Sequence, residues 1–139
     1  MFEHILVPTD LTERSMVALE VAIKMAVHDA SKVTLLHVIE TIVDTECEDF
    51  DDFYKKLGKR AGKKMDKMIL LHQNNNVAVR KEITYGKRVT EILKYAHEHA
   101  IDLIVLSSHK IDSADATQGW GTISYKVGIL SQCPVLLVK

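Results

Sequence analysis

Residues 4–10 read HILVPTD, and this stretch decides the fold of the chain. It is a short apolar run that ends at Pro8 and is followed at once by polar residues, which is typical of a buried β-strand. Three more apolar runs lie further along, at residues 32–38, 103–106 and 134–138. Strands with such continuous apolar runs are covered on both faces, as in parallel sheets. The sequence therefore predicts a parallel sheet at the centre of the molecule.

Segments with the apolar spacing of amphipathic helices separate these strands. Apolar residues recur at intervals of three and four over residues 18–26, 57–68, 89–100 and 123–130. Residues 77–85 alternate and predict a further strand, which Gly86 ends, and we expect Thr12 to be the N-cap of the first helix. Strict alternation of strand and helix predicts an α/β fold, an open five-stranded parallel sheet with helices on both faces.

Length and composition suit a single domain over residues 1–139. The chain is 47% apolar and 27% charged, a mixture that excludes overall disorder. Its net charge of −1 argues against a dedicated nucleic-acid binder. No window approaches 18 uncharged apolar residues, and the first residues lack the features of a signal peptide, so we expect no membrane association and a cytoplasmic location.

The cysteines and histidines are not spaced as a metal or redox motif. Cys47 and Cys133 form no CxxC pair, so we expect two free thiols and a buried Cys133. The seven histidines are scattered, and we expect no metal site. His37 lies within a predicted strand, where we expect a core residue with a hydrogen-bond partner.

A strongly basic stretch follows an acidic one in the middle of the chain. Residues 45–52 are acidic, whereas residues 55–67 carry seven Lys or Arg residues at positions compatible with one helix. Asp51 with Lys55, and Asp52 with Lys56, have the spacing of helical ion pairs. The simpler interpretation is a solvated helix face, and the alternative is a docking surface for an acidic partner.

Two loops at predicted carboxyl ends of strands carry polar chemistry. In open α/β sheets, ligands bind beyond these ends, where neighbouring strands connect in opposite directions. One loop follows the first strand with Thr9 and Asp10, and the other follows the fourth strand from Ser107 onward. Gly121 precedes the last helix, whose free N–H groups can bind an anion. The alternative is that the glycines only shape a loop.

Several well-known chemistries are excluded by the residues that stand at the decisive positions. The loop after the first strand has no glycine, so it is not the GxGxxG turn of dinucleotide-binding proteins. The chain has no GxxxxGK[ST] motif of P-loop NTPases and no GxSxG nucleophile motif. The third strand ends in Ile83-Thr84-Tyr85, without the acidic residue that a receiver domain requires.

Four segments together resemble the universal stress protein family over the whole chain. These are HILVPTDLTERS at residues 4–15, LLHVIE at 35–40, DLIVLSSH at 102–109 and SQCPVLLVK at 131–139. The resemblance implies the strand order 3-2-1-4-5, which places the first and fourth strands side by side. It also implies a homodimer paired through the C-terminal strand, which would cover an exposed sheet edge.

Some members of this family bind ATP, and the resemblance assigns site residues by position. Pro8, Thr9 and Asp10 would line the ribose side, and Asp10 would accept hydrogen bonds from the ribose hydroxyls. Val38 would offer its backbone to the adenine, and Leu106 would lie beneath the base. The implied ligand is ATP with Mg²⁺, or a related adenine nucleotide.

The phosphate loop departs from the pattern of the ATP-binding members, which is Gly, two residues, Gly, nine residues, then Gly with Ser or Thr. Ser107 and Lys110 replace the first two glycines, and ten residues separate Lys110 from Gly121. A side chain there can obstruct close backbone approach, whereas the Lys110 ammonium can contact phosphate. The retained end of the motif would hold the phosphates: Gly121, Thr122, Ile123 and Ser124.

Three functional hypotheses remain open from the sequence. The first is a non-catalytic regulatory domain that binds ATP or a related nucleotide at the ends of the first and fourth strands. The second is a dimeric interaction protein without nucleotide, which docks an unidentified protein partner through residues 55–67 or Trp120. The third is weak ATP hydrolysis or self-phosphorylation at Thr122 or Ser124, for which Asp10 and His109 have no evident supporting group.

Overall fold

Five parallel strands form one sheet in the computed structural model, which describes residues 1–42, 49–72, 76–108 and 123–139. The strands are β1 (His4–Pro8), β2 (Lys32–Ile39), β3 (Val79–Tyr85), β4 (Leu103–Ser107) and β5 (Val135–Val138). Their order in the sheet is β3-β2-β1-β4-β5, so both the parallel sheet and the order 3-2-1-4-5 are confirmed.

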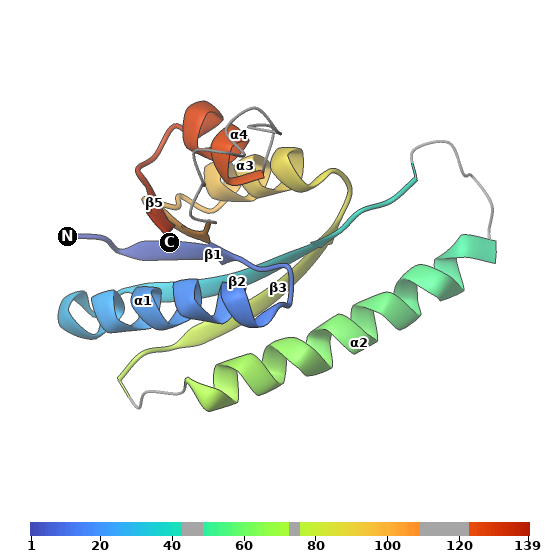
Figure 1. The fold of residues 1–139 in the computed structure, drawn as a ribbon, viewed down its shortest axis with the longest axis horizontal. Helices are drawn as coiled ribbons and strands as arrows, with labels where there is room; N and C mark the ends of the chain where they lie inside the picture. Colours follow the sequence, from blue (N-terminus) through green and yellow to red (C-terminus); the bar gives the residue numbers. More distant parts are fainter. Residues whose placement is uncertain (43–48, 73–75, 109–122) are drawn as a thin grey trace, which may run out of the picture.

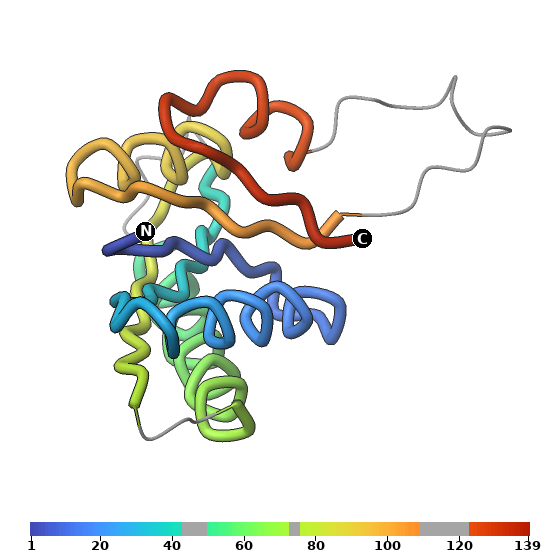
Figure 2. Tube along the Cα trace, turned by 90° about the vertical axis from the view of Figure 1, so that its left-hand side faces the viewer, coloured from blue at the N-terminus to red at the C-terminus, as the bar shows by residue number. Residues whose placement is uncertain are grey.

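The helices cover the sheet in two pairs. They are α1 (Glu13–Asp29), α2 (Asp49–Leu71), α3 (Arg88–Glu98) and α4 (Ile123–Leu130). Figures 1 and 2 show α1 and α2 on one side of the sheet and α3 and α4 on the other. No helix among the described residues is long and apolar enough to cross a membrane.

The apolar strands contribute side chains to two hydrophobic cores, one on each face of the sheet. Successive side chains of a strand point to opposite faces, so Ile5 and Val7 pack toward α1 and α2 while Leu6 packs toward α3 and α4. All three side chains are fully buried. Met65 of α2 belongs to the first core and Ile92 of α3 to the second. This arrangement explains why the central strands lack polar alternation.

The prediction that Thr12 is the N-cap residue of α1 is confirmed, but its hydroxyl donates to Asp10 and makes no cap bond to a helix N–H. Two other local predictions are wrong. Cys133 is half-buried, because it precedes an edge strand that is covered incompletely. The ion pairs expected between residues 51 and 55 and between 52 and 56 do not form. Exposed pairs of this kind gain little energy from holding two long side chains in place.

The two edge strands of the sheet differ in charge. On β3, Arg80 pairs with Glu82 at 2.8 Å, and Lys81 pairs with Asp66 of α2, also at 2.8 Å. The strand β5 reads VLLV without a charged residue, and its Leu136 is 38% exposed. One edge is therefore charged and the other apolar.

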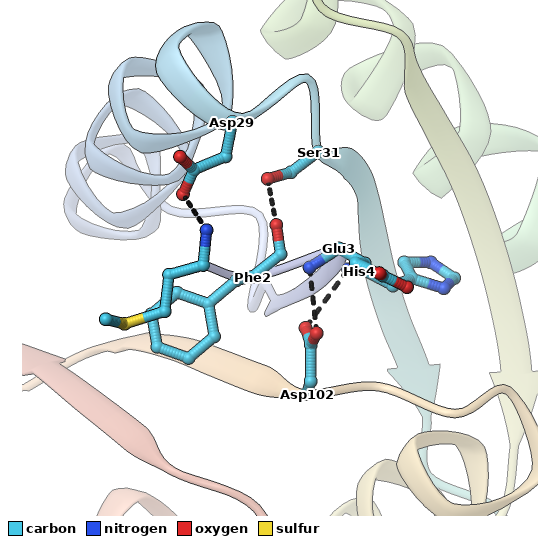
Figure 3. A network of polar contacts seen from close by, with 7 residues as sticks. Phe2, Glu3, His4, Asp29, Ser31 and Asp102 are labelled. Carbon is cyan, nitrogen blue, oxygen red and sulfur yellow. Dashed lines mark hydrogen bonds and ion pairs between the residues drawn. The ribbon is translucent and has the colours of Figure 1, made fainter.

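At the amino edge of the sheet, where the strands begin, side chains form hydrogen bonds with the backbone of neighbouring segments (Figure 3). The Asp102 carboxylate, just before β4, accepts the backbone N–H of Glu3 at 2.8 Å and that of His4 at 3.0 Å. The Ser31 hydroxyl, just before β2, donates to the backbone carbonyl of Phe2. These contacts tie the starts of β1, β2 and β4 together.

Candidate functional site

A cavity of about 830 Å³ lies at the carboxyl edge of the sheet. Its volume is within the range of small-molecule sites, roughly 300–1,000 Å³. The pairing of β1 with β4 brings the loops after these strands together, as the sequence predicts. Eight of the predicted site residues line the cavity: Pro8, Thr9, Asp10, Val38, Leu106, Ser107, Ile123 and Ser124. Their roles in binding stay predictions.

The remaining predicted site residues lie outside the part of the chain that the structure describes. They are Lys110, Gly121 and Thr122. Trp120 and His109 also fall there. The roles given to these residues therefore also stay predictions.

Sequence reasoning missed several residues that line the same cavity. They come from the first turn of α1 and from β2 and α3: Thr12, Glu13, Arg14, Ser15, Leu36, Arg88 and Ile92. Leu36 was accessible to prediction, because it lies two positions before Val38 and so shares its face of the strand. Arg88 is the first residue of the helix that follows β3. Because all parallel strands of a sheet end at one edge, this position could have indicated that Arg88 lies near the cavity.

The turn after β1 is built around the buried side chain of Thr9. Its hydroxyl accepts the backbone N–H of Leu11 at 3.0 Å and lies 2.6 Å from the hydroxyl of Ser15. The Ser15 hydroxyl in turn donates to the carbonyl of Thr12 at 2.7 Å. These bonds hold Leu11 at a φ of 67°, a left-handed conformation that is costly for a leucine. Local hydrogen bonds therefore fix the loop that presents Asp10.

His37 supports this turn from the neighbouring strand. Its Nδ1 lies 2.8 Å from the backbone carbonyl oxygen of Thr9, and a carbonyl can only accept, so Nδ1 carries the proton. The Thr9 N–H donates to the carbonyl of Leu36 at 2.8 Å. The hydrogen-bond partner predicted for His37 is confirmed, but the prediction that His37 is a core residue is wrong, because its side chain is only half-buried.

Asp10 is held as an ionised carboxylate at the cavity wall. Partial burial by itself raises the pKa of Asp10, but donation from the hydroxyl and N–H of Thr12 outweighs it, so the pKa lies below the ordinary 3.8. Both bonds go to Oδ1, at 2.5 Å from the hydroxyl and 3.0 Å from the N–H. The positive charge of Arg88 also lowers the pKa of Asp10. Among the described residues, both of these hydrogen bonds to the Asp10 carboxylate use Oδ1.

Arg88 brings positive charge to the lining of the cavity. Its guanidinium Nε is 3.5 Å from Oε1 of Glu40, and the side chain remains partly exposed. A pair of this length and exposure is weak. Arg88 is therefore available to an anionic group in the cavity.

Ser107, which stands in place of the first glycine of the family pattern, turns its side chain toward α1. Its hydroxyl donates to the backbone carbonyl of Arg14 at 2.8 Å. The hydroxyl of Ser124 lies 3.5 Å from that of Ser108. The replacement at position 107 therefore adds a link between β4 and α1 and leaves the cavity open beside it.

The cavity has an apolar and a polar part. Leu36, Val38, Ile92 and Leu106 come from β2, α3 and β4, and all four are buried. Carboxylate, guanidinium and hydroxyl groups provide the polar part. Within the described residues, no group of three or more His, Cys, Asp or Glu side chains could hold a metal ion. The arrangement suits a ligand with a flat apolar portion and a polar, anionic portion.

Comparison with protein-family models gives one family for the whole chain. The model described as the universal stress protein family matches residues 1–139. Universal stress protein YxiE of Bacillus subtilis is 33% identical over 153 aligned positions, which cover all of both chains. Universal stress protein MJ0577 of Methanocaldococcus jannaschii is 28% identical, covering all of this chain and 96% of its own.

Comparison with solved structures gives the same fold. The structure of MJ0577 matches with a TM-score of 0.81 at 29% identity, covering 100% of this chain and 96% of that one. A universal stress protein in complex with cAMP matches with a TM-score of 0.70 at 18% identity, over 99% and 97% of the two chains. The universal stress protein of Archaeoglobus fulgidus in complex with dAMP matches with a TM-score of 0.71 at 16% identity, over 99% and 98%.

Proposed function

Because the chain belongs to the universal stress protein family, we propose that it is a regulatory, non-catalytic domain that binds an adenine nucleotide in the cavity at the carboxyl edge. One observation carries the proposal. Asp10, whose carboxylate accepts both bonds from Thr12 through Oδ1, lines a cavity that also has an apolar wall. A ribose diol and a purine need these two environments side by side.

Each part of the nucleotide has a counterpart among the lining residues. Oδ2 of Asp10 accepts from the ribose hydroxyls, and charge-assisted bonds of this kind are stronger than neutral ones. The purine lies against Val38 and Leu106. The phosphates are met by Ser124 and Arg88, together with residues 110, 121 and 122 of the predicted phosphate loop.

The structural relatives support this choice of ligand. Two structures of the same fold are complexes with adenine nucleotides, one with cAMP and one with dAMP. We propose ATP as the ligand here, with Mg²⁺ entering on the phosphates, because Mg²⁺ in nucleotide sites keeps several waters and is bound by substrate phosphates with only one or two carboxylates. The altered phosphate loop makes AMP and cAMP the alternatives to compare.

We also propose that the chain forms a homodimer through β5. This strand lies at the edge of the sheet and has no charged residue. Leu136 on the strand and Ile129 on α4 are exposed, the latter at 62%. An uncharged edge strand offers unpaired backbone groups to another strand, and a second copy would cover both.

Calorimetric titration of dialysed protein with ATP and Mg²⁺, AMP and cAMP tests the nucleotide site. We expect at least one nucleotide to bind, and Asp10→Asn to weaken its binding by roughly 10- to 100-fold, since a hydrogen bond to a charged group contributes about 1.5–3 kcal/mol. Asn retains an oxygen for Thr12, so the turn should stay folded. Asp52→Asn, an exposed change on α2 far from the cavity, is the matched control.

Two outcomes contradict the proposal. If none of the three nucleotides binds, the interaction protein without nucleotide becomes the better hypothesis. If a nucleotide binds equally well to Asp10→Asn, the ribose role is wrong. A thermal shift supplies an independent readout, because a ligand at about 100 times its Kd stabilises a protein by roughly 2.7 kcal/mol.

A further inference from the structure

A basic face runs along the solvent side of α2. It consists of seven exposed cationic side chains: Lys55, Lys56, Lys59, Arg60, Lys63, Lys64 and Lys67. With 3.6 residues per turn, these positions fall on one half of the helix in two rows with four-residue spacing. The opposite half packs on the sheet through Ala61, Met65 and Met68, all buried. Figure 1 shows α2 lying along the outer side of the molecule.

The charge of the basic face is not balanced within the protein. None of its seven cations forms an ion pair with any described residue. Asp66, the acidic residue among them, pairs instead with Lys81 of β3. Like charges at four-residue spacing oppose helix formation. The helix thus carries a cost that an external negative partner would relieve.

The rest of the chain limits what that partner can be. Residues 55–67 carry a net charge of +6, so the remaining residues together carry −7 when the whole chain carries −1. A long polyanion such as duplex nucleic acid or an anionic bilayer would extend beyond the basic face, where the chain adds no further net positive charge. A short acidic segment can place all of its carboxylates on the face. The charge distribution therefore favours a partner about as long as the face, roughly 18 Å at 1.5 Å per residue.

Exposed apolar side chains stand at both ends of the basic face. Phe53, 54% exposed, precedes Lys56 by three positions, and Leu71, 72% exposed, follows Lys67 by four. Leu70, 70% exposed, lies beside Leu71. Protein interfaces combine buried apolar contacts with polar ones, so a protein partner can cover these side chains. Phosphate backbones have no group that buries such side chains.

Two other occupants fit the face less well. A membrane-surface helix inserts its apolar side, but the apolar side of α2 is already buried against the sheet. A second copy could bring its own α2, but antiparallel pairing would set the lysines of the two central turns against each other. A single-sign face requires a partner of the opposite sign.

We propose that the basic face of α2 docks an acidic protein segment, a helix whose carboxylates repeat every four residues and whose ends carry apolar side chains. The carboxylates match the two rows of cations, and the apolar ends cover Phe53, Leu70 and Leu71. This site lies on α2 and needs no residue of the nucleotide cavity. The two proposals can therefore fail independently.

Fluorescence anisotropy with a synthetic probe tests the docking. The probe is a labelled helical peptide of about 20 residues, with glutamates every four residues and leucines at both ends. The control peptide has glutamine in place of glutamate. We expect the acidic probe to bind at least about tenfold more tightly than the control, and its binding to weaken when the salt rises from about 50 to about 300 mM.

Charge reversal on the face provides the decisive variant. Lys59→Glu with Lys64→Glu should weaken probe binding by at least about tenfold. The new glutamates each stand three or four residues from retained cations, so the helix should be at least as stable as before. Loss of binding then cannot be attributed to unfolding. The matched control, Lys94→Glu with Lys126→Glu, changes the net charge equally on exposed residues of α3 and α4 and should bind normally.

Four results would overturn the proposal. The acidic probe fails to bind at low salt, or it binds the α2 variant as well as the original protein. A duplex DNA of similar length, or vesicles of phosphatidylserine and phosphatidylcholine, binds more tightly than the probe and is lost in the α2 variant. Sedimentation detects self-association that the α2 variant abolishes, which would make a second copy the occupant.

Discussion

The two edges of the sheet each hold a key aspartate, and the protein uses the two differently. At the amino edge, both carboxylate oxygens of Asp102 accept backbone N–H groups, from Glu3 and from His4. At the carboxyl edge, Asp10 accepts both hydrogen bonds from Thr12 through Oδ1 and lines a cavity. Asp102 therefore uses both carboxylate oxygens to stabilise the fold, whereas Asp10 accepts the bonds from Thr12 through one oxygen.

The difference follows from what each edge must connect. The amino edge joins the starts of strands, and its polar groups satisfy one another (Figure 3). The carboxyl edge carries turns with their own internal bonds, such as the Thr9 hydroxyl to Leu11 N–H bond. Because these bonds stabilise the turn, the turn does not depend on the side chain that it presents to the cavity. Changes at the amino edge should therefore reduce stability, and changes at the carboxyl edge should affect mainly ligand binding.

The largest expected effect is at the amino edge. Asp102→Ala removes the acceptor for two backbone N–H groups, and we expect it to lower the free energy of unfolding by about 2–3 kcal/mol. Urea denaturation measures this loss. Asp102→Asn keeps one acceptor oxygen and should lose less. A loss of under about 0.5 kcal/mol for the alanine variant would remove the basis of the comparison.

An intermediate effect is expected from pH, in separate windows for the two edges. Burial lowers the pKa of His4 below 6.5, and Lys32 acts in the same direction. As pH falls below 6.5 the unfolded state binds a proton before the folded state does, so stability is lost between 6.5 and the folded pKa. For Asp10, with a folded pKa below 3.8, stability is lost as pH falls through 3.8 toward that lower value.

Urea unfolding over a pH series from about 7.5 to about 3 separates the two windows. His4→Gln should remove only the loss near neutral pH, and Asp10→Asn only the acid loss. The comparison would fail if either variant flattened both windows. Coupling of that kind would mean that the two edges do not respond independently.

The smallest expected effect is that of Thr12→Ala. Loss of a working N-cap costs about 1 kcal/mol, but the Thr12 hydroxyl makes no cap bond, so we expect a loss below about 0.5 kcal/mol. The hydroxyl bond to Asp10 disappears, and the pKa of Asp10 should rise toward 3.8. Carboxyl ¹³C titration of Asp10 measures the rise. An unchanged pKa would show that the backbone N–H of Thr12 is sufficient.

The fold was predictable from the sequence because its central strands are buried on both faces. Ile5, Leu6 and Val7 are consecutive apolar residues without polar alternation. A strand with one face in solvent would expose some of them, so the run indicates burial on both faces. The family resemblance then gave the order of the strands. Details that depend on competition between alternative partners were not predictable, such as the hydroxyl of Thr12, which donates to Asp10 and makes no cap bond to the helix.

The site was predictable where residues directly follow a strand, and less so elsewhere. Asp10 lies two residues beyond the end of β1 and Ser107 is the last residue of β4, and parallel pairing must bring them to one edge. Arg88 reaches the cavity only because α3 packs over the face that Leu36 and Leu106 share. The position of Arg88 after β3 indicates the carboxyl edge, but which face of the sheet α3 covers is decided by tertiary packing and not by a local pattern.

The two edge strands of the sheet, β3 and β5, differ in charge, and this difference has a consequence for assembly. Strand β3 carries Arg80, Lys81 and Glu82, and such charges discourage a further strand from joining. Each copy then has one edge strand able to pair with another strand, β5. If β5 pairs with the β5 of a second copy, one two-fold contact covers the edge strands of both copies. Growth stops at two subunits, and the chain is protected from polymerising into fibres.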